Sequence, residues 1–307
     1  MKIAKKKHFV LYVLLGVLLF FILSTLFFLL ISKYALRVTS YRIVSDKVLS
    51  PFKIVNLSDL HSTCFGKNNI RLINKVSEEK PDIICMTGDS VSSTDTDFSV
   101  TTDLVSSLKS IAPVYVSLGN HETDLSESEL SRFISEIESA GGTVLEKEYV
   151  DVVINGNDVR IGGTSGYALW MEFWEDSYGK KYIDYWDDDS FSEQRFLLDF
   201  QDTDAYKILL LHRPESATLF WADKGWYDVD LVLSGHTHGG HIRLPFIGGL
   251  YAPEEGWFPK YEYGHFNKNG VDVIISAGLG NSEGLPRFNN IPEIVSVTVS
   301  GVSDDSE

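Results

Sequence analysis

The chain has 307 residues, 44% of them hydrophobic and 23% charged, which is long enough to bury a sizeable core. Its 27 Lys and Arg residues face 43 Asp and Glu residues, a formal net charge of −16 at pH 7. Residues 47–307 hold 42 of the acidic residues but only 20 of the basic ones, so a polyanion such as nucleic acid is disfavoured as the main partner.

The first predicted element is a transmembrane helix over residues 9–31, a run of 23 residues without a charged side chain. At 1.5 Å per residue such a helix crosses a hydrocarbon core of ~30 Å. Four lysines precede the run, and the positive-inside bias therefore predicts a single-pass protein of the cell membrane with its folded domain extracytoplasmic. A cleaved signal peptide or a buried core helix remain the alternatives, although the run exceeds the 7–15 apolar residues of a cleaved signal.

The rest of the chain predicts an α/β fold with two facing mixed β-sheets flanked by helices, because strands and helices alternate first and strands then dominate. We expect a basic cytoplasmic leader over 1–8, a connector over 32–50, the main domain over 51–300 and a polar tail over 301–307. Helices are expected near 67–79, 98–110 and 127–140. Further strands are expected at 143–155, 159–162, 208–211, 231–233, 271–276 and 294–299.

Polar motifs follow five short apolar runs that are typical of buried strands. The runs are Lys53–Leu57, Asp82–Met86, Val114–Leu118, Ile208–Leu211 and Asp230–Leu233. The motifs are Asp59-Leu60-His61, Gly88-Asp89, Gly119-Asn120-His121-Glu122, His212 and Gly235-His236-Thr237-His238. Because chemistry in open α/β sheets gathers at the carboxyl ends of strands, we expect these side chains to meet at one edge.

The motif residues indicate a metal site. Side chains two positions apart on an extended segment point to the same side. Asp59 with His61, and His236 with His238, can therefore each bind a metal ion from one face. Imidazole and carboxylate groups are the ligands that Zn, Mn and Fe accept, with the Asn oxygen a weaker addition. The seven candidates are too many for one tetrahedral ion and suit two metals that share a carboxylate. They are Asp59, His61, Asp89, Asn120, His212, His236 and His238.

A different metal site is a weaker interpretation. His236, His238 and His241 have the spacing of the metallo-β-lactamase-type hydrolases. Those enzymes need Asp where this chain has Gly240, and the interpretation leaves the earlier motifs unexplained. A lone buried His or Asp is more often structural than a ligand, and His8 and His265 are expected to be ordinary.

The order of the motifs resembles the calcineurin-like metallophosphoesterases over about residues 52–299. The stretch from Gly235 to Pro245, with Gly278-Leu279-Gly280 and Pro292-Glu293-Ile294, resembles the membrane-anchored bacterial branch of YkuE/YaeI-type phosphoesterases. The chain has His241 where this branch has Gln, a departure that leaves the candidate ligands unchanged.

This resemblance implies a four-layer αββα sandwich and two divalent ions, which could be Mn, Fe, Zn or Mg. Asp59, His61 and His238 would bind one ion, Asn120, His212 and His236 the other, and Asp89 would bridge them. A hydroxide that bridges the metals would attack a phosphomonoester, phosphodiester or pyrophosphate bond without a covalent phospho-enzyme. His121 would be the catalytic residue that protonates the leaving group or stabilises its charge.

Alternatives of substrate and function stay open. The substrate would be a small phosphate ester or a lipid-linked one, and the helix would contact the membrane. A pyrophosphatase of a nucleotide-linked lipid precursor such as UDP-2,3-diacylglucosamine is the second hypothesis, which an extracytoplasmic domain disfavours. A non-catalytic binding module on the same fold is the third, and the complete set of candidate ligands disfavours it.

Two further features lie outside these motifs. Cys64 and Cys85 are the only cysteines, too few for a disulfide framework, and we expect them to be unpaired. The segment from Trp170 to Phe191 combines aromatic and acidic residues. It is expected to be an insertion that packs on the domain, with a substrate-facing cap or a membrane-proximal surface as the alternatives.

Overall fold

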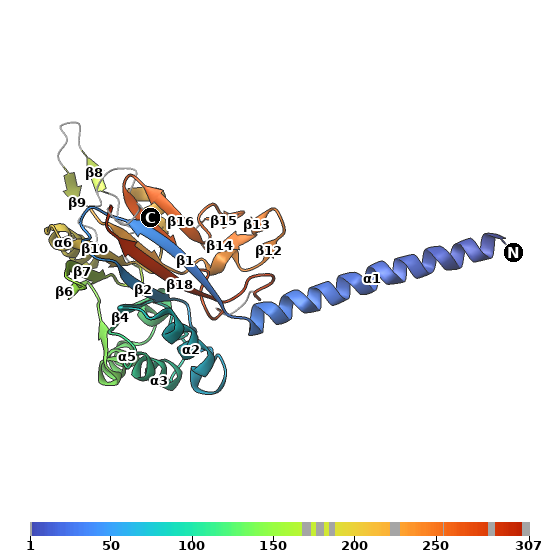
Figure 1. The fold of residues 1–307 in the computed structure, drawn as a ribbon, viewed down its shortest axis with the longest axis horizontal. Helices are drawn as coiled ribbons and strands as arrows, with labels where there is room; N and C mark the ends of the chain where they lie inside the picture. Colours follow the sequence, from blue (N-terminus) through green and yellow to red (C-terminus); the bar gives the residue numbers. More distant parts are fainter. Residues whose placement is uncertain are drawn as a thin grey trace.

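The computed structural model describes residues 2–167, 173–175, 181–183, 188–221, 228–253, 255–281 and 286–302. Its first element is the helix α1 (Lys2–Tyr34), which extends away from the domain (Figure 1). The stretch from His8 to Tyr34 has a mean hydropathy of 2.9 and is long enough to span a membrane. None of the most apolar 18-residue window of this helix is buried, which excludes the core-helix alternative; a membrane span and a signal sequence both fit.

The first sheet has six strands in the order β1-β18-β2-β3-β4-β5. Strands β2 to β5 run parallel, β18 is antiparallel to β2, and β1 is parallel to β18. The strands are β1 (Arg37–Val44), β2 (Phe52–Leu57), β3 (Ile83–Thr87), β4 (Val114–Ser117), β5 (Gly142–Val144) and β18 (Glu293–Ser300). Three helices pack on its outer face through an apolar cluster: α2 (Ile70–Glu79, after a 3₁₀ turn at Lys67–Asn69), α3 (Ser99–Leu108) and α5 (Glu127–Ala140).

The second sheet also has six strands, in the order β16-β17-β11-β10-β7-β6. Its four central strands are parallel, and β6 and β16 are antiparallel edges. The strands are β6 (Glu148–Ile154), β7 (Asn157–Gly163), β10 (Tyr206–Leu210), β11 (Leu231–Ser234), β16 (Gly264–Lys268) and β17 (Val271–Ile275). Helix α6 (Asp188–Gln201) places Phe196 and Phe200 in the apolar cluster that covers its outer face.

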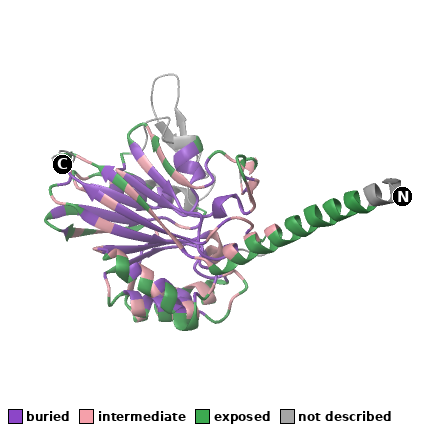
Figure 2. Cartoon of the chain, turned by 45° about the vertical axis from the view of Figure 1, so that its right-hand side comes forward, coloured by how far each residue is buried: buried purple, intermediate pink, exposed green. Residues whose placement is uncertain are grey.

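A central apolar core lies between the two sheets, where Ile54 and Ile83 of the first sheet join Ile161 and Ile208 of the second. Figure 2 shows that the strands are buried along most of their length while the helices expose their outer faces. This arrangement confirms the predicted α/β fold of two facing mixed sheets flanked by helices.

Two details differ from the sequence-based expectations. Strand β1 lies within residues 32–50, where only a connector was expected, because its partly exposed, Arg-containing pattern does not resemble a buried strand. The single strand expected over 143–155 is wrong: β5 and β6 belong to different sheets. The chain crosses between them where Leu145 donates its N–H to Val116 and Lys147, at φ 57°, donates to Gly163. The proposed domain limits stay a prediction.

Three small hairpins complete the structure. They are β8 (Phe173–Glu175) with β9 (Lys181–Ile183), β12 (Arg243–Leu244) with β13 (Gly248–Gly249), and β14 (Tyr251–Ala252) with β15 (Gly256–Trp257). The aromatic and acidic segment from Trp170 to Phe191 includes the first hairpin and the start of α6. The rest of that segment, and its side chains, lie outside the described residues.

Candidate metal centre

The loops that follow β2, β3, β10 and β11 bring the candidate ligands of both sheets together. These side chains form two groups, and within each group the ligand atoms all lie within 4.8 Å of one another. The first group is Asp59, His61, Asp89 and His238, and the second is Asp89, His212 and His236. Asp89 belongs to both groups, so its carboxylate lies between two potential metal positions.

The backbone at these residues is strained. Asp59, His61, Asp89, His236 and His238 all have φ between 44° and 69°, the left-handed region that residues with a Cβ avoid. Hydrogen bonds between the loops hold this conformation, since the N–H of Asp59 donates to Gly88 and that of His61 donates to Asp89. Strain repeated at neighbouring positions is typical of functional sites, where the surrounding structure compensates for its cost.

Two glycines are required by close packing around the candidate ligands. A Cβ at Gly119 would collide with the carboxylate of Asp89, and one at Gly235 would collide with Ser58 and Asp59. The glycines that precede the Asn and His motifs therefore let the loops approach one another.

The electrostatics at the centre favour positive charge. Nε2 of His212 lies 3.2 Å from Oδ2 of Asp89, and its Nδ1 lies 2.9 Å from the carbonyl oxygen of Thr87. Burial lowers the pKa of His212, but the Asp89 carboxylate outweighs that effect and raises the pKa to about 10. Burial alone would raise the pKa of Asp89, and the charge of His212 instead holds it below its ordinary value.

The donor atoms fit divalent metal ions. Among the described residues, both ring nitrogens of His61 and Oδ1 of Asn120 are buried without a hydrogen-bond partner. Buried polar atoms are almost always paired, so these atoms point to a missing partner. Burial lowers the pKa of His61 and of His238, which favours the neutral imidazole that metals bind.

Asn120 and His121 begin α4 (Asn120–Thr123) beside the bridging position, since the N–H of His121 donates to Oδ1 of Asp89 at 2.9 Å. Nε2 of His121 lies 3.9 Å from Oδ2 of Asp89, and its ring contacts that of His61 at 4.8 Å between centroids. The His121 side chain is 21% exposed, whereas those of His61 and His212 are fully buried. His121 therefore lies on the open side of the cluster.

Glu122 organises the loops, a role that the sequence analysis missed. Its buried carboxylate accepts hydrogen bonds from four backbone N–H groups, those of Asp89, Ser90, Val91 and Gly119. Burial, together with the negative charge of Asp89, raises the pKa of Glu122 to about 7. Its place directly after His121 in the Gly-Asn-His-Glu motif was the available signal.

Two residues that contact His238 were also missed, because they lie in a segment without a ligand motif. They are Arg287 and Asn290. Nη2 of Arg287 lies 3.4 Å from Nδ1 of His238, and Nδ2 of Asn290 donates to the His238 carbonyl at 2.6 Å. The ring of His241 packs against that of His238 in a tilted arrangement, with 4.9 Å between ring centroids. Burial and the charge of Arg287 lower the pKa of His241 to about 4, so this residue is neutral beside the cluster.

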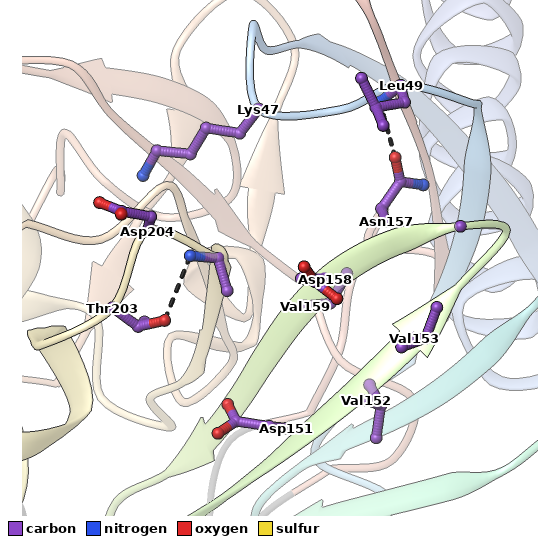
Figure 3. Close-up of a pocket in the computed structure, with 12 residues that line it drawn as sticks. Lys47, Leu49, Asp151, Val152, Val153, Asn157, Asp158, Val159, Thr203 and Asp204 are labelled. Carbon is purple, nitrogen blue, oxygen red and sulfur yellow. Dashed lines mark hydrogen bonds between the residues drawn. The ribbon is translucent and has the colours of Figure 1, made fainter.

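A cavity of about 650 Å³ lies elsewhere, at the amino ends of β7 and β10 (Figure 3). Two of its charged groups already have partners, since Lys47 pairs with Asp230 at 2.9 Å and Asp151 with Arg160 at 2.7 Å. The candidate ligand His212 follows the opposite, carboxyl end of β10, so the cavity is separate from the metal centre.

Comparisons with known proteins agree with this geometry. The model of the calcineurin-like phosphoesterase family matches residues 52–240. A metallophosphoesterase of Aquifex aeolicus is 29% identical over 87% of this chain and 93% of its own length. Phosphodiesterase YaeI of Escherichia coli is 30% identical over 80% of this chain and 81% of its own. Metallophosphoesterase YkuE of Bacillus subtilis is 29% identical over 82% of this chain and 80% of its own.

Proposed function

The chain belongs to the calcineurin-like phosphoesterase family, hydrolases of phosphoesters that use two divalent metal ions, and we propose that the residues around Asp89 hold those ions. Asp59, His61 and His238 would bind one ion, Asn120, His212 and His236 the other, and Asp89 both. The observation that carries this proposal is the membership of Asp89 in both groups of ligand atoms. The buried ring nitrogens and amide oxygen without partners support it.

Two ions held there would lower the pKa of a bound water and neutralise the charge on phosphoryl oxygens. The protein's own part would be to position the phosphate and to move a proton. His121 suits the second task because its ring lies on the open side of the cluster. Its backbone N–H binds Asp89, so its position depends on the same carboxylate that joins the two metal positions.

The substrate class is a small-molecule phosphate ester, which could be a monoester, a diester or a pyrophosphate. The proposal is tested with the purified full chain in detergent, freed of metal by a chelator and reloaded with Mn, Fe, Zn or Mg. We expect hydrolysis of nitrophenyl mono- or diesters that a chelator abolishes and one of these metals restores. Tight binding of two ions without hydrolysis of any ester, nucleotide or lipid pyrophosphate would instead favour a binding module.

For localisation, we propose that α1 anchors the chain in the cell membrane as a single span with the domain outside the cytoplasm. The basic leader before the apolar run supports this orientation. Protease added to spheroplasts should digest the domain while a cytoplasmic control protein survives. Protection of the domain until lysis would reverse the orientation and favour hydrolysis of a nucleotide-linked lipid precursor such as UDP-2,3-diacylglucosamine.

A further inference from the structure

Four apolar side chains on two neighbouring hairpins are exposed. Phe246 is fully exposed, and Ile247, Trp257 and Phe258 are between 60% and 71% exposed. We call these four residues the apolar rim. The first two connect β12 to β13, and the other two end the β14–β15 hairpin, whose Phe258 donates its N–H to Leu250. Exposed aromatic clusters of this kind mark interaction surfaces.

The backbone conformation of the apolar rim makes its aromatic residues costly. Phe246 has φ 68° and Phe258 has φ 58°, so both adopt the left-handed conformation for which turns select Gly or Asn. For a residue with a bulky side chain, this conformation costs roughly 1–3 kcal/mol. Neither ring gains burial within the chain that would offset this cost, so internal stability does not account for Phe at these positions.

The β12–β13 and β14–β15 hairpins, which carry the apolar rim, lie on the side of the domain from which α1 leaves (Figure 1). Phe28 of α1 packs on Phe288 with 5.4 Å between ring centroids, and Phe288 accepts a hydrogen bond from the N–H of Arg243 in β12. One turn further along α1, Oγ of the buried Ser32 accepts a hydrogen bond from the N–H of Asn290. A short chain of contacts therefore links the apolar helix to the hairpin that carries Phe246.

The same hairpin is bound to the metal centre. Nη1 of Arg243 donates to the Gly239 carbonyl at 2.8 Å and to Glu262 at 2.7 Å, while Glu262 also accepts from the N–H of Gly249 at 2.7 Å. Gly239 directly follows the candidate ligand His238. At ~3.5 Å per residue, the eight residues from His238 to Phe246 span at most about 28 Å. Glu262 thus fixes the β12–β13 hairpin, which carries Phe246 and Ile247, relative to the loop of His238.

We propose that the apolar rim inserts into the surface of the lipid bilayer that α1 enters, so that the metal centre faces the membrane and acts on an amphipathic phosphate ester whose apolar part stays in the bilayer. Aromatic side chains favour the membrane interface, where their rings are buried beside polar headgroups. The acidic domain cannot bind anionic lipids by charge, so apolar insertion is the contact that its composition allows. The substrate class rests on the proposed phosphoester hydrolysis, whereas the insertion itself does not.

The insertion is tested on the full chain, reconstituted in phosphatidylcholine vesicles that contain acyl chains with a nitroxide quencher. In a Cys64→Ser background, an environment-sensitive fluorophore is attached to Phe246→Cys, to Trp257→Cys or, as the matched control, to Val153→Cys. Val153 is equally an exposed apolar residue, but it lies in β6, the edge strand of the second sheet, and lines the cavity at the amino ends of β7 and β10 (Figure 3). We expect quenching by lipid at positions 246 and 257 and none at 153.

Equal, weak quenching at all three positions would overturn the insertion. Labels at 246 and 257 that are shielded from lipid and from aqueous iodide alike would also overturn it, because a protein partner or a second copy would then cover the apolar rim. The labels report insertion whether or not the chain hydrolyses any ester, so this result is independent of the proposed function.

The substrate class is tested with Phe246→Ser/Trp257→Ser in the same vesicles. We expect kcat/KM for a dialkyl lipid phosphate ester to fall about tenfold or more, 1.4 kcal/mol, with hydrolysis of a soluble nitrophenyl ester unchanged. Equal effects on both substrates would overturn the lipid substrate class. If the parent chain hydrolyses neither ester with any metal, the proposed function fails, and the labels still decide the insertion.

Discussion

The backbone N–H of Ser93 donates a hydrogen bond to Nδ1 of His121 at 3.1 Å. Because Nδ1 accepts this bond, a neutral His121 ring carries its proton on Nε2, the nitrogen 3.9 Å from Asp89 Oδ2. The loop after β3 thus supplies both the carboxylate at the centre of the metal cluster and the contact that sets the tautomer of the neighbouring histidine. A proton on Nε2 can donate a hydrogen bond to the leaving-group oxygen and so stabilise the charge that develops there.

His121→Ala should therefore slow turnover without releasing metal. We expect kcat to fall by roughly 10²–10⁴-fold, the range for a positioned acid. The loss should be larger for an alkyl phosphate ester than for a nitrophenyl ester, because a nitrophenolate leaves without full protonation. Metal analysis beside kinetics checks this, and a His121→Ala protein depleted of metal would contradict the role proposed for the side chain.

Glu122 is expected to matter for stability more than for chemistry. Glu122→Ala leaves four buried N–H groups without their acceptor, and we expect the free energy of unfolding to fall by about 3 kcal/mol or more. Glu122→Gln keeps one oxygen acceptor and should lose less. Denaturant unfolding of the two variants, with the exposed Glu138→Ala as control, measures this. A Glu122→Ala protein as stable as the control would show that the hydrogen bonds of Glu122 do not stabilise the two loops.

Metal binding should release a proton and strengthen as the pH rises. In the metal-free protein the pKa of His212 is raised to about 10 by Asp89, so the ring holds a proton at neutral pH that a metal ion must displace. The affinity for Mn should then rise by up to about tenfold for each pH unit between pH 6 and 8. Calorimetry in buffers of different ionisation enthalpy counts the protons released. An affinity that does not change with pH would show that metal binding displaces no proton from His212.

The two cysteines should differ in reactivity. Both are free; Cys64 is exposed, whereas Cys85 is buried in β3, where burial raises the pKa of its thiol above the ordinary value. We expect one thiol per chain to react with a maleimide in the folded protein and two after denaturation. Peptide mass spectrometry identifies the labelled residue. A disulfide-linked peptide of Cys64 and Cys85 from non-reduced protein would contradict this expectation.

The two sheets could be predicted because buried parallel strands appear in the sequence as continuous apolar runs. The family could be predicted because the metal-ligand motifs follow these runs directly. Strand β1 was missed because its pattern of burial and its two arginines are those of an exposed edge. Glu122, Arg287 and Asn290 act through backbone groups of residues distant in the chain, and only the folded structure brings these together. The roles of the individual ligands stay predictions.

The most direct test of the account is the metal content of the Asp89→Asn protein. Asp89 is the only carboxylate shared by both groups of ligand atoms in the described part of the chain, so its loss should disturb both metal positions together. Metal analysis of the full chain should find two ions per parent chain and in Asp124→Asn, a nearby exposed control. It should find fewer than one in Asp89→Asn, together with loss of phosphoester hydrolysis. An Asp89→Asn protein that keeps two ions and full activity would contradict the shared dimetal site.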